Sequence, residues 1–238
     1  MPSSIAYYRP ICQDSTCTVD GSTFGAATGA FAFSNTLYMP SGNNRALIIS
    51  LGSENLGDSD TTVSAATYNG VALTLLDTKS VTTTGFWASV RQYIIKDADL
   101  PAATGTYNVA FSISTAIASS FQLQSSITQL HNVSQDATVL NYNKISGGGD
   151  TTSLTINATP ISRGSWVLAS SQCGQSGAFS VPFPQVMTYR VEWAVTTTHV
   201  GSIYKYSTDS TTLAINQTYT GGSFNRQVMT AAVLSPSL

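Results

Sequence analysis

Of the three cysteines in this sequence, Cys173 is the candidate nucleophile, and the two histidines are the candidate bases. Cys173 lies in SSQCGQSG, a segment of small residues, and the histidines are His131 and His199. A cysteine nucleophile needs an imidazole within hydrogen-bonding distance, which the sequence establishes for neither histidine. Neither histidine lies in a motif, so we interpret both as solvent-facing or as structural histidines with a partner.

An acidic segment offers a second kind of chemistry. Glu54, Asp58 and Asp60 lie in GSENLGDSD, and clustered carboxylates are typical ligands of calcium. Their spacing does not match an EF-hand loop or a calcium-binding repeat. An acidic surface loop is therefore the favoured interpretation.

Pairs of acids and exposed aromatic residues would both point to sugars. Glycoside hydrolysis would need Asp97 with Asp99, or Glu192 with a distant partner. Neighbouring loop acids rarely serve that role, and Glu192 fits the outward face of a strand. Sugar binding without hydrolysis stays open, and core packing is the commoner fate of strand tryptophans such as Trp87, Trp166 and Trp193. We therefore predict a protein that is not an enzyme, with no catalytic, cofactor-binding or metal-binding residues.

The overall composition favours a folded, weakly charged protein. Charged residues make up only 9% of the 238 residues, whereas hydrophobic residues make up 42% and the net charge is −2. Disordered chains lack this apolar content, and nucleic-acid-binding domains carry a basic excess. We expect no nucleic-acid partner and no membrane span, and we expect a surface that associates easily because it repels itself weakly.

The amino-terminal region differs from the rest of the chain. Residues 1–35 show no sustained period, and we interpret them as an extended arm, with a frayed tail as the alternative. Cys12 and Cys17 could close a small loop, although free thiols are the favoured interpretation. No apolar signal segment is apparent, so we expect no signal peptide.

A β-hairpin at VSAATYNGVALTLL is the clearest structural signal. Asn69-Gly70 separates two apolar runs and favours a two-residue type I′ turn, because both positions need positive φ. That register places Tyr68 opposite Val71, Ala66 opposite Leu73 and Ser64 opposite Leu75 on one face.

Strand patterns then recur to the end of the chain. Residues 107–113 and 187–195 alternate between apolar and polar positions, and residues 45–51 form a short apolar run. Helical periodicity is nearly absent. We predict an all-β fold, an antiparallel β-sandwich that is jelly-roll-like, as one domain over residues 36–238.

The order of these segments resembles a β-sandwich module of tailed-bacteriophage virion proteins and some bacterial surface proteins. The similarity lies in the motifs RALIISLGS, TYNGVALT, WASVRQYII, GTYNVAF, ITQLHNVSQDA and RQVMTAAVLSP, which span about residues 45 to 235. The resemblance implies a virion structural protein that is made in the host cytoplasm and lies on the capsid surface, a decoration (cement) protein that bridges neighbouring subunits. It implies the major capsid protein and further copies of this chain as partners, as a trimer or another cyclic oligomer. The alternative is a tail- or fibre-associated sandwich that binds a carbohydrate or a receptor.

Overall fold

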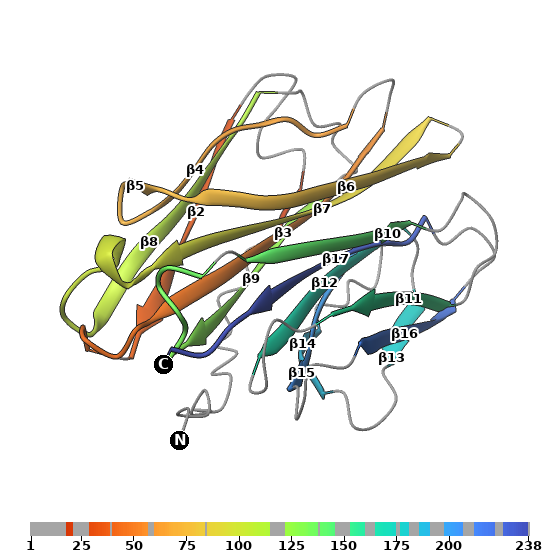
Figure 1. The fold of residues 1–238 in the computed structure, drawn as a ribbon. Coiled ribbons are helices and arrows are strands. Elements are labelled where there is room, and N and C mark those ends of the chain that lie inside the picture. Colours follow the sequence, from red (N-terminus) through yellow and green to blue (C-terminus); the bar gives the residue numbers. More distant parts are fainter. Residues whose placement is uncertain are drawn as a thin grey trace.

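The residues that the structure describes form four stacked antiparallel β-sheets, seen as successive layers from the top left to the bottom right of Figure 1. The computed structural model describes residues 18–20, 29–38, 40–56, 60–83, 85–114, 122–137, 139–145, 153–159, 165–174, 177–180, 186–190, 198–206, 212–221 and 226–237. This architecture confirms the predicted all-β fold with antiparallel sheets packed against each other.

The first two layers form an amino-terminal sandwich. Its N-outer sheet has the order β2 (Gly29–Leu37), β8 (Gly105–Ile113), β4 (Val63–Tyr68) and β5 (Val71–Ala72). Its N-inner sheet has the order β1 (Thr18–Asp20), β9 (Gln122–Leu130), β3 (Ala46–Leu56), β7 (Phe86–Lys96) and β6 (Thr74–Thr83).

The other two layers form a carboxy-terminal sandwich. Its C-inner sheet has the order β10 (Leu140–Ile145), β17 (Val228–Leu234), β12 (Trp166–Gly174), β15 (Thr198–Tyr206) and β14 (Val186–Arg190). Its C-outer sheet has the order β11 (Ser153–Ala158), β16 (Leu213–Gly221) and β13 (Gly177–Ser180).

The two sandwiches repeat the same strand order. Counted along the chain, β1 corresponds to β10, β2 to β11, β3 to β12 and β4 to β13, and β6 to β9 correspond to β14 to β17. Both the inner and the outer sheet orders then coincide, apart from the short β5. The described structure is therefore a tandem repeat of one sandwich, whose inner sheets lie against each other. The packed interface between the two halves is compatible with the predicted single domain over residues 36–238, which stays a prediction.

Three apolar layers hold the four sheets together. The first fills the amino-terminal sandwich, with Tyr68 and Phe111 among its fully buried side chains. The second joins the inner sheets, where Ile48 packs with Trp166 and Leu168. The third fills the carboxy-terminal sandwich. Burial of this apolar area is the main stabilising contribution, at about 25 cal/mol per Å².

A row of polar residues crosses the interface between the inner sheets. Ser50 lies opposite Gln92 and Ser126 in the N-inner sheet, and its equivalent Ser170 lies opposite positions 202 and 230 in the C-inner sheet. The two serine hydroxyls hydrogen-bond to each other, and Gln92 Nε2 donates to Ser170 Oγ (2.9 Å) and to the Leu168 carbonyl (3.1 Å). These bonds fix the alignment of the two sheets, because a buried polar group without a partner is costly.

The predicted hairpin is correct at its turn and wrong beyond it. Asn69 and Gly70 have φ of 50° and 79°, and Tyr68 pairs with Val71. Leu73 still donates its N–H to the Ala66 carbonyl at 2.9 Å. The chain then crosses to the N-inner sheet, so Leu75 pairs with Tyr93 and not with Ser64 as predicted. This crossing closes the sandwich and buries Leu73 partly against its core.

The predicted arm over residues 1–35 is not confirmed. Thr18–Asp20 pairs with β9, and Gly29–Leu37 pairs with β8 along its full length. The sandwich therefore begins before residue 36. Residues 1–17, including Cys12 and Cys17, and residues 21–28 lie outside the described part of the chain.

We expect the substitution Ile48→Ala to lower the free energy of unfolding by about 2–5 kcal/mol, because Ile48 is buried between the two sandwiches and its removal leaves a cavity. Leu75→Ala is the matched control, since Leu75 is 49% exposed, and it should cost less than about 0.5 kcal/mol. Urea denaturation followed by circular dichroism measures both. Equal effects of the two substitutions would contradict the packing of the inner sheets.

We expect the protein to lose stability at high pH because two tyrosines, Tyr68 and Tyr93, are buried in the core. Burial raises the pKa of Tyr93 to about 12, partly opposed by Arg91, and burial raises the pKa of Tyr68 further. Because an unfolded tyrosine ionises near pH 10, this stabilisation is complete below about pH 10 and is lost as the pH rises toward 12. Urea denaturation at several alkaline pH values should show this decline, and Tyr93→Phe should make it shallower. An unchanged slope would refute the assignment.

Candidate functional site

The predicted cysteine and histidine candidates are separated into two places. Backbone register puts Cys173 on β12 directly opposite His199 on β15. The side chains of these two residues lie outside the described part of the structure. His131 directly follows Leu130 of β9, which packs in one apolar cluster with Trp166 at the opposite end of β12 from Cys173. Desolvation by burial lowers the pKa of His131. The backbone therefore pairs the cysteine position with one histidine position and not with the other.

The acids of the predicted loop do not form one cluster. Glu54 is 3% exposed and forms an ion pair with Arg226 at 2.5 Å, whereas Asp60 forms an ion pair with Arg91 at 3.0 Å. Asp58 lies outside the described residues. Each described carboxylate is thus matched to its own guanidinium, so the acidic surface loop we favoured is wrong for Glu54, which is a buried ion-pair residue. In the part of the chain that the structure describes, no three metal-ligating side chains gather.

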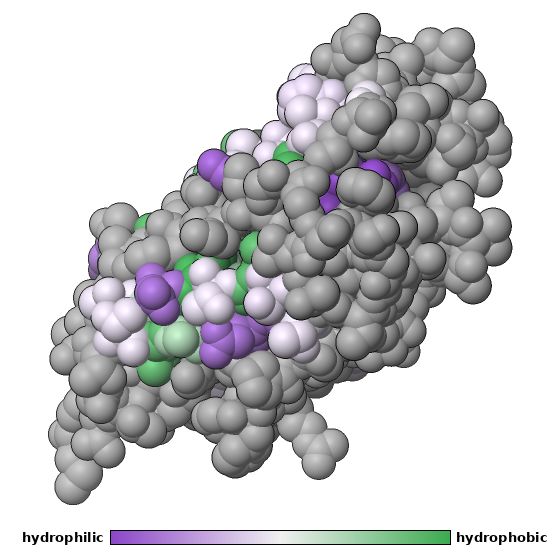
Figure 2. Space-filling view, turned by 90° about the vertical axis from the view of Figure 1, so that its right-hand side faces the viewer, coloured by the Kyte–Doolittle hydropathy of each residue, from purple (hydrophilic) through white to green (hydrophobic). Residues whose placement is uncertain are grey.

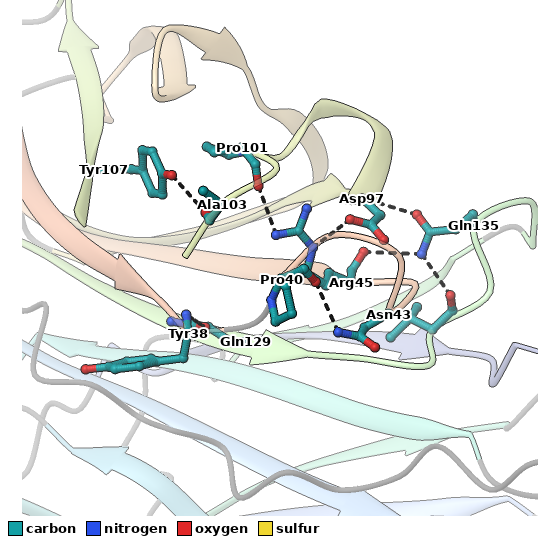
Figure 3. A network of polar contacts seen from close by, with 11 residues as sticks. Tyr38, Pro40, Asn43, Arg45, Asp97, Pro101, Ala103, Tyr107, Gln129 and Gln135 are labelled. Atoms are coloured by element: carbon teal, nitrogen blue, oxygen red, sulfur yellow. Dashed lines mark hydrogen bonds and ion pairs between the residues drawn. The ribbon is translucent and has the colours of Figure 1, made fainter. Parts of the chain in front are cut away.

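The predicted acid pair at the end of β7 has a structural partner. Asp97 begins the short 3-10 helix η2 (Asp97–Asp99). Its carboxylate forms an ion pair at 2.6 Å with Arg45, whose side chain is fully buried. Arg45 also donates to the Pro101 carbonyl at 2.9 Å, so it ties two loops together (Figure 3). Asp99 is exposed, and Glu192 lies outside the described residues.

Gln135 connects this arginine to the segment that leaves β9. Its Nε2 donates to the Arg45 and Val133 carbonyls, and its Oε1 accepts from the Asp97 N–H at 3.0 Å (Figure 3). Lys96 Nζ donates to the Gln135 carbonyl at 2.7 Å, and desolvation by burial lowers the pKa of Lys96. Because every polar atom named here bonds within the fold, this network is an anchor for the chain between the sandwiches.

The three strand tryptophans, which we expected to pack in the core, differ in their burial. Trp166 is 4% exposed and belongs to the apolar layer between the inner sheets, as predicted for strand tryptophans. Trp87 is half-buried on β7, and Trp193 lies outside the described residues. Trp166 is therefore no surface for stacking a sugar.

A polar pocket of about 390 Å³ lies at the open edge of the amino-terminal sandwich. Three segments line it, namely residues 60–63 before and at the start of β4, residues 78–80 of β6, and Arg91 of β7. The pocket exists because β5 has only two residues, so the N-outer sheet ends there and leaves the inner face of β6 uncovered.

Arg91 fixes the floor of this pocket. Its side chain is largely buried, and its NH1 donates to Ser89 Oγ at 2.8 Å, while Ser53 and Ser89 share a 2.6 Å hydrogen bond. Its NH2 donates to Asp60 Oδ2 and to the Thr61 carbonyl. The guanidinium and carboxylate are therefore held rigidly, and their charges compensate each other.

Sequence reasoning named only Asp60 among the pocket residues. The available signal was Arg91 itself, a charged residue at a core-facing position of the strand WASVRQYII, in line with the buried Tyr93 and Ile95. The lining residues come from three separated segments, so their meeting depends on the crossing of the chain between sheets.

Comparison with known proteins identifies no relative. No family model matches the chain, and neither the curated proteins nor the solved structures include a match. Among the residues that the structure describes, no helix has the length and apolar character needed to cross a membrane.

We expect Arg91→Met to lower the free energy of unfolding by about 3 kcal/mol, because it leaves the partly buried Asp60 carboxylate without its guanidinium partner and removes the other hydrogen bonds of the buried Arg91. The double substitution Arg91→Met with Asp60→Asn should recover part of this loss, because it also removes the unpaired charge. Urea denaturation of the single and double variants measures both effects. Strictly additive losses would contradict the coupling of the two residues.

Proposed function

We propose that this chain is a structural protein of a virus particle, a capsid decoration protein that bridges neighbouring subunits of the shell and associates with copies of itself. The proposal rests on the resemblance of the motif order, on the jelly-roll part of the fold prediction and on the surface of the amino-terminal sandwich. A protein of this kind works by burying surface across the junction between subunits.

The strand order supports the jelly-roll interpretation. In the amino-terminal half, β1-β9-β3-β7 faces β2-β8-β4-β5, so consecutive strands alternate between two facing sheets up to the hairpin at Asn69-Gly70. Jelly rolls of eight strands are common in viral capsid domains. The carboxy-terminal half repeats this order with β10 to β17.

The weakly charged surface also supports an adhesive role. Arg45, Arg91 and Arg226 each form an ion pair inside the fold, so their charges are neutralised there and do not contribute to the surface of a chain that has few charges. On the face shown in Figure 2, the described residues are mostly neutral in hydropathy, with small hydrophilic and hydrophobic areas between them. Such a surface repels a similar neighbour only weakly.

The open edge of the amino-terminal sandwich carries the proposal. Val71 on β5 is 38% exposed and Leu75 on β6 is 49% exposed, and the two lie where the chain crosses between sheets. Large apolar side chains in this position can anchor a specific contact, which typically buries about 800 Å² on each partner.

Mass spectrometry and electron cryomicroscopy of purified particles test this proposal. We expect the chain in the particle, with density for its four-layered fold on the outer capsid surface. The double substitution Val71→Asp and Leu75→Asp should abolish its incorporation and leave its circular dichroism spectrum unchanged. As a control of equal charge, Ser153→Asp and Thr155→Asp alter exposed positions on β11 and should leave incorporation unchanged.

Two outcomes would contradict the decoration role. The first is absence of the chain from the particles. The second is density on the tail or fibres, which would favour the alternative of a receptor- or carbohydrate-binding sandwich.

A further inference from the structure

We infer that the polar pocket at the open edge of the amino-terminal sandwich binds a neutral, polyhydroxylated ligand, such as one monosaccharide unit of a glycan. This inference does not depend on the role in a virus particle. It rests on the charges and hydroxyl groups that line the pocket.

The shape of the pocket follows from the β6 strand. Because side chains alternate along a strand, Thr78 and Ser80 face the same side, and both are opposite core-facing positions of β7, namely Arg91 and Ser89. Thr78 is exposed and Ser80 is half-buried, so their hydroxyls line the wall at two depths. The volume of about 390 Å³ lies within the range of small-molecule sites.

The charges of the pocket select the class of ligand. Asp60 accepts hydrogen bonds from Arg91 and from the Thr61 N–H at 2.7 Å, and a carboxylate has room for further donors. Lys79 also belongs to the lining, but it lies opposite Val90, so its side chain faces the other side of β6 from Thr78 and Ser80. An anionic ligand would meet the Asp60 carboxylate, and a cationic ligand would meet the Arg91 guanidinium. Val63 is the one large apolar residue among the lining residues that the structure describes, so an apolar ligand would desolvate polar groups without replacing their hydrogen bonds.

A neutral ligand with several hydroxyl groups satisfies all of these constraints. Each of its hydroxyls both donates and accepts, so it can donate to Asp60 and exchange hydrogen bonds with Thr78 and Ser80. Arg91 is held in place by Ser53, Ser89 and the Thr61 carbonyl, so the polar groups are oriented before the ligand arrives. A preformed site loses less conformational freedom on binding.

Ligand-observed saturation-transfer NMR on the full chain tests this inference. The probes are glucose, galactose, mannose and N-acetylglucosamine, with inorganic phosphate and citrate as anionic comparators. We expect saturable binding of at least one neutral sugar. The double substitution Thr78→Val and Ser80→Ala should weaken that binding about tenfold, because it removes two hydrogen-bonding groups.

The matched control makes the same two changes in the other sandwich. Ser153→Ala with Thr155→Val alters two exposed residues spaced by two on β11, and it should leave sugar binding unchanged. Circular dichroism and thermal unfolding confirm that both double variants are folded. The inference is overturned if no sugar binds saturably, if both variants weaken binding equally, or if only phosphate or citrate binds.

Discussion

Burial of the N-inner sheet on both of its faces is the constraint on which the rest of the structure depends. Arg45 and residues 46–54 of the central strand β3 are buried without interruption, because alternate side chains of the strand face the amino-terminal core and the second sandwich. A strand in that position must be almost wholly uncharged or must have its charges paired. Arg45, directly before β3, and Glu54, near its end, accordingly each form an ion pair within the fold.

The repeat explains how this burial is achieved. Strand β3 meets its equivalent β12 across the interface, and Ser50 and Ser170, each the fifth residue of its strand, hydrogen-bond to each other, as at the axis of an isologous dimer. The two halves thus resemble two subunits joined in one chain. The inner sheets bury their facing surfaces against each other, so the outer sheets and the open edge near Leu75 remain accessible to other molecules.

Local sequence patterns predicted the elements better than their assembly. The Asn69-Gly70 turn and the alternation that buries Val109 and Phe111 follow from backbone preference and side-chain period, which are local properties. The crossing after Leu73 and the duplication of the sandwich depend on pairing between distant segments, and the two halves share topology with little obvious sequence repetition. The pocket escaped prediction for the same reason, since its walls come from separate strands.

Cross-linking at the contact between the inner sheets tests the four-layered arrangement most directly. Ser50→Cys with Ser170→Cys places two thiols where the two hydroxyls bond, and mass spectrometry of the oxidised, unreduced protein identifies the linked peptides. The account predicts a 50–170 disulfide in a protein with an unchanged circular dichroism spectrum. A folded double variant in which these two cysteines remain unlinked, or link only to the native cysteines, would contradict the face-to-face packing of the two sandwiches.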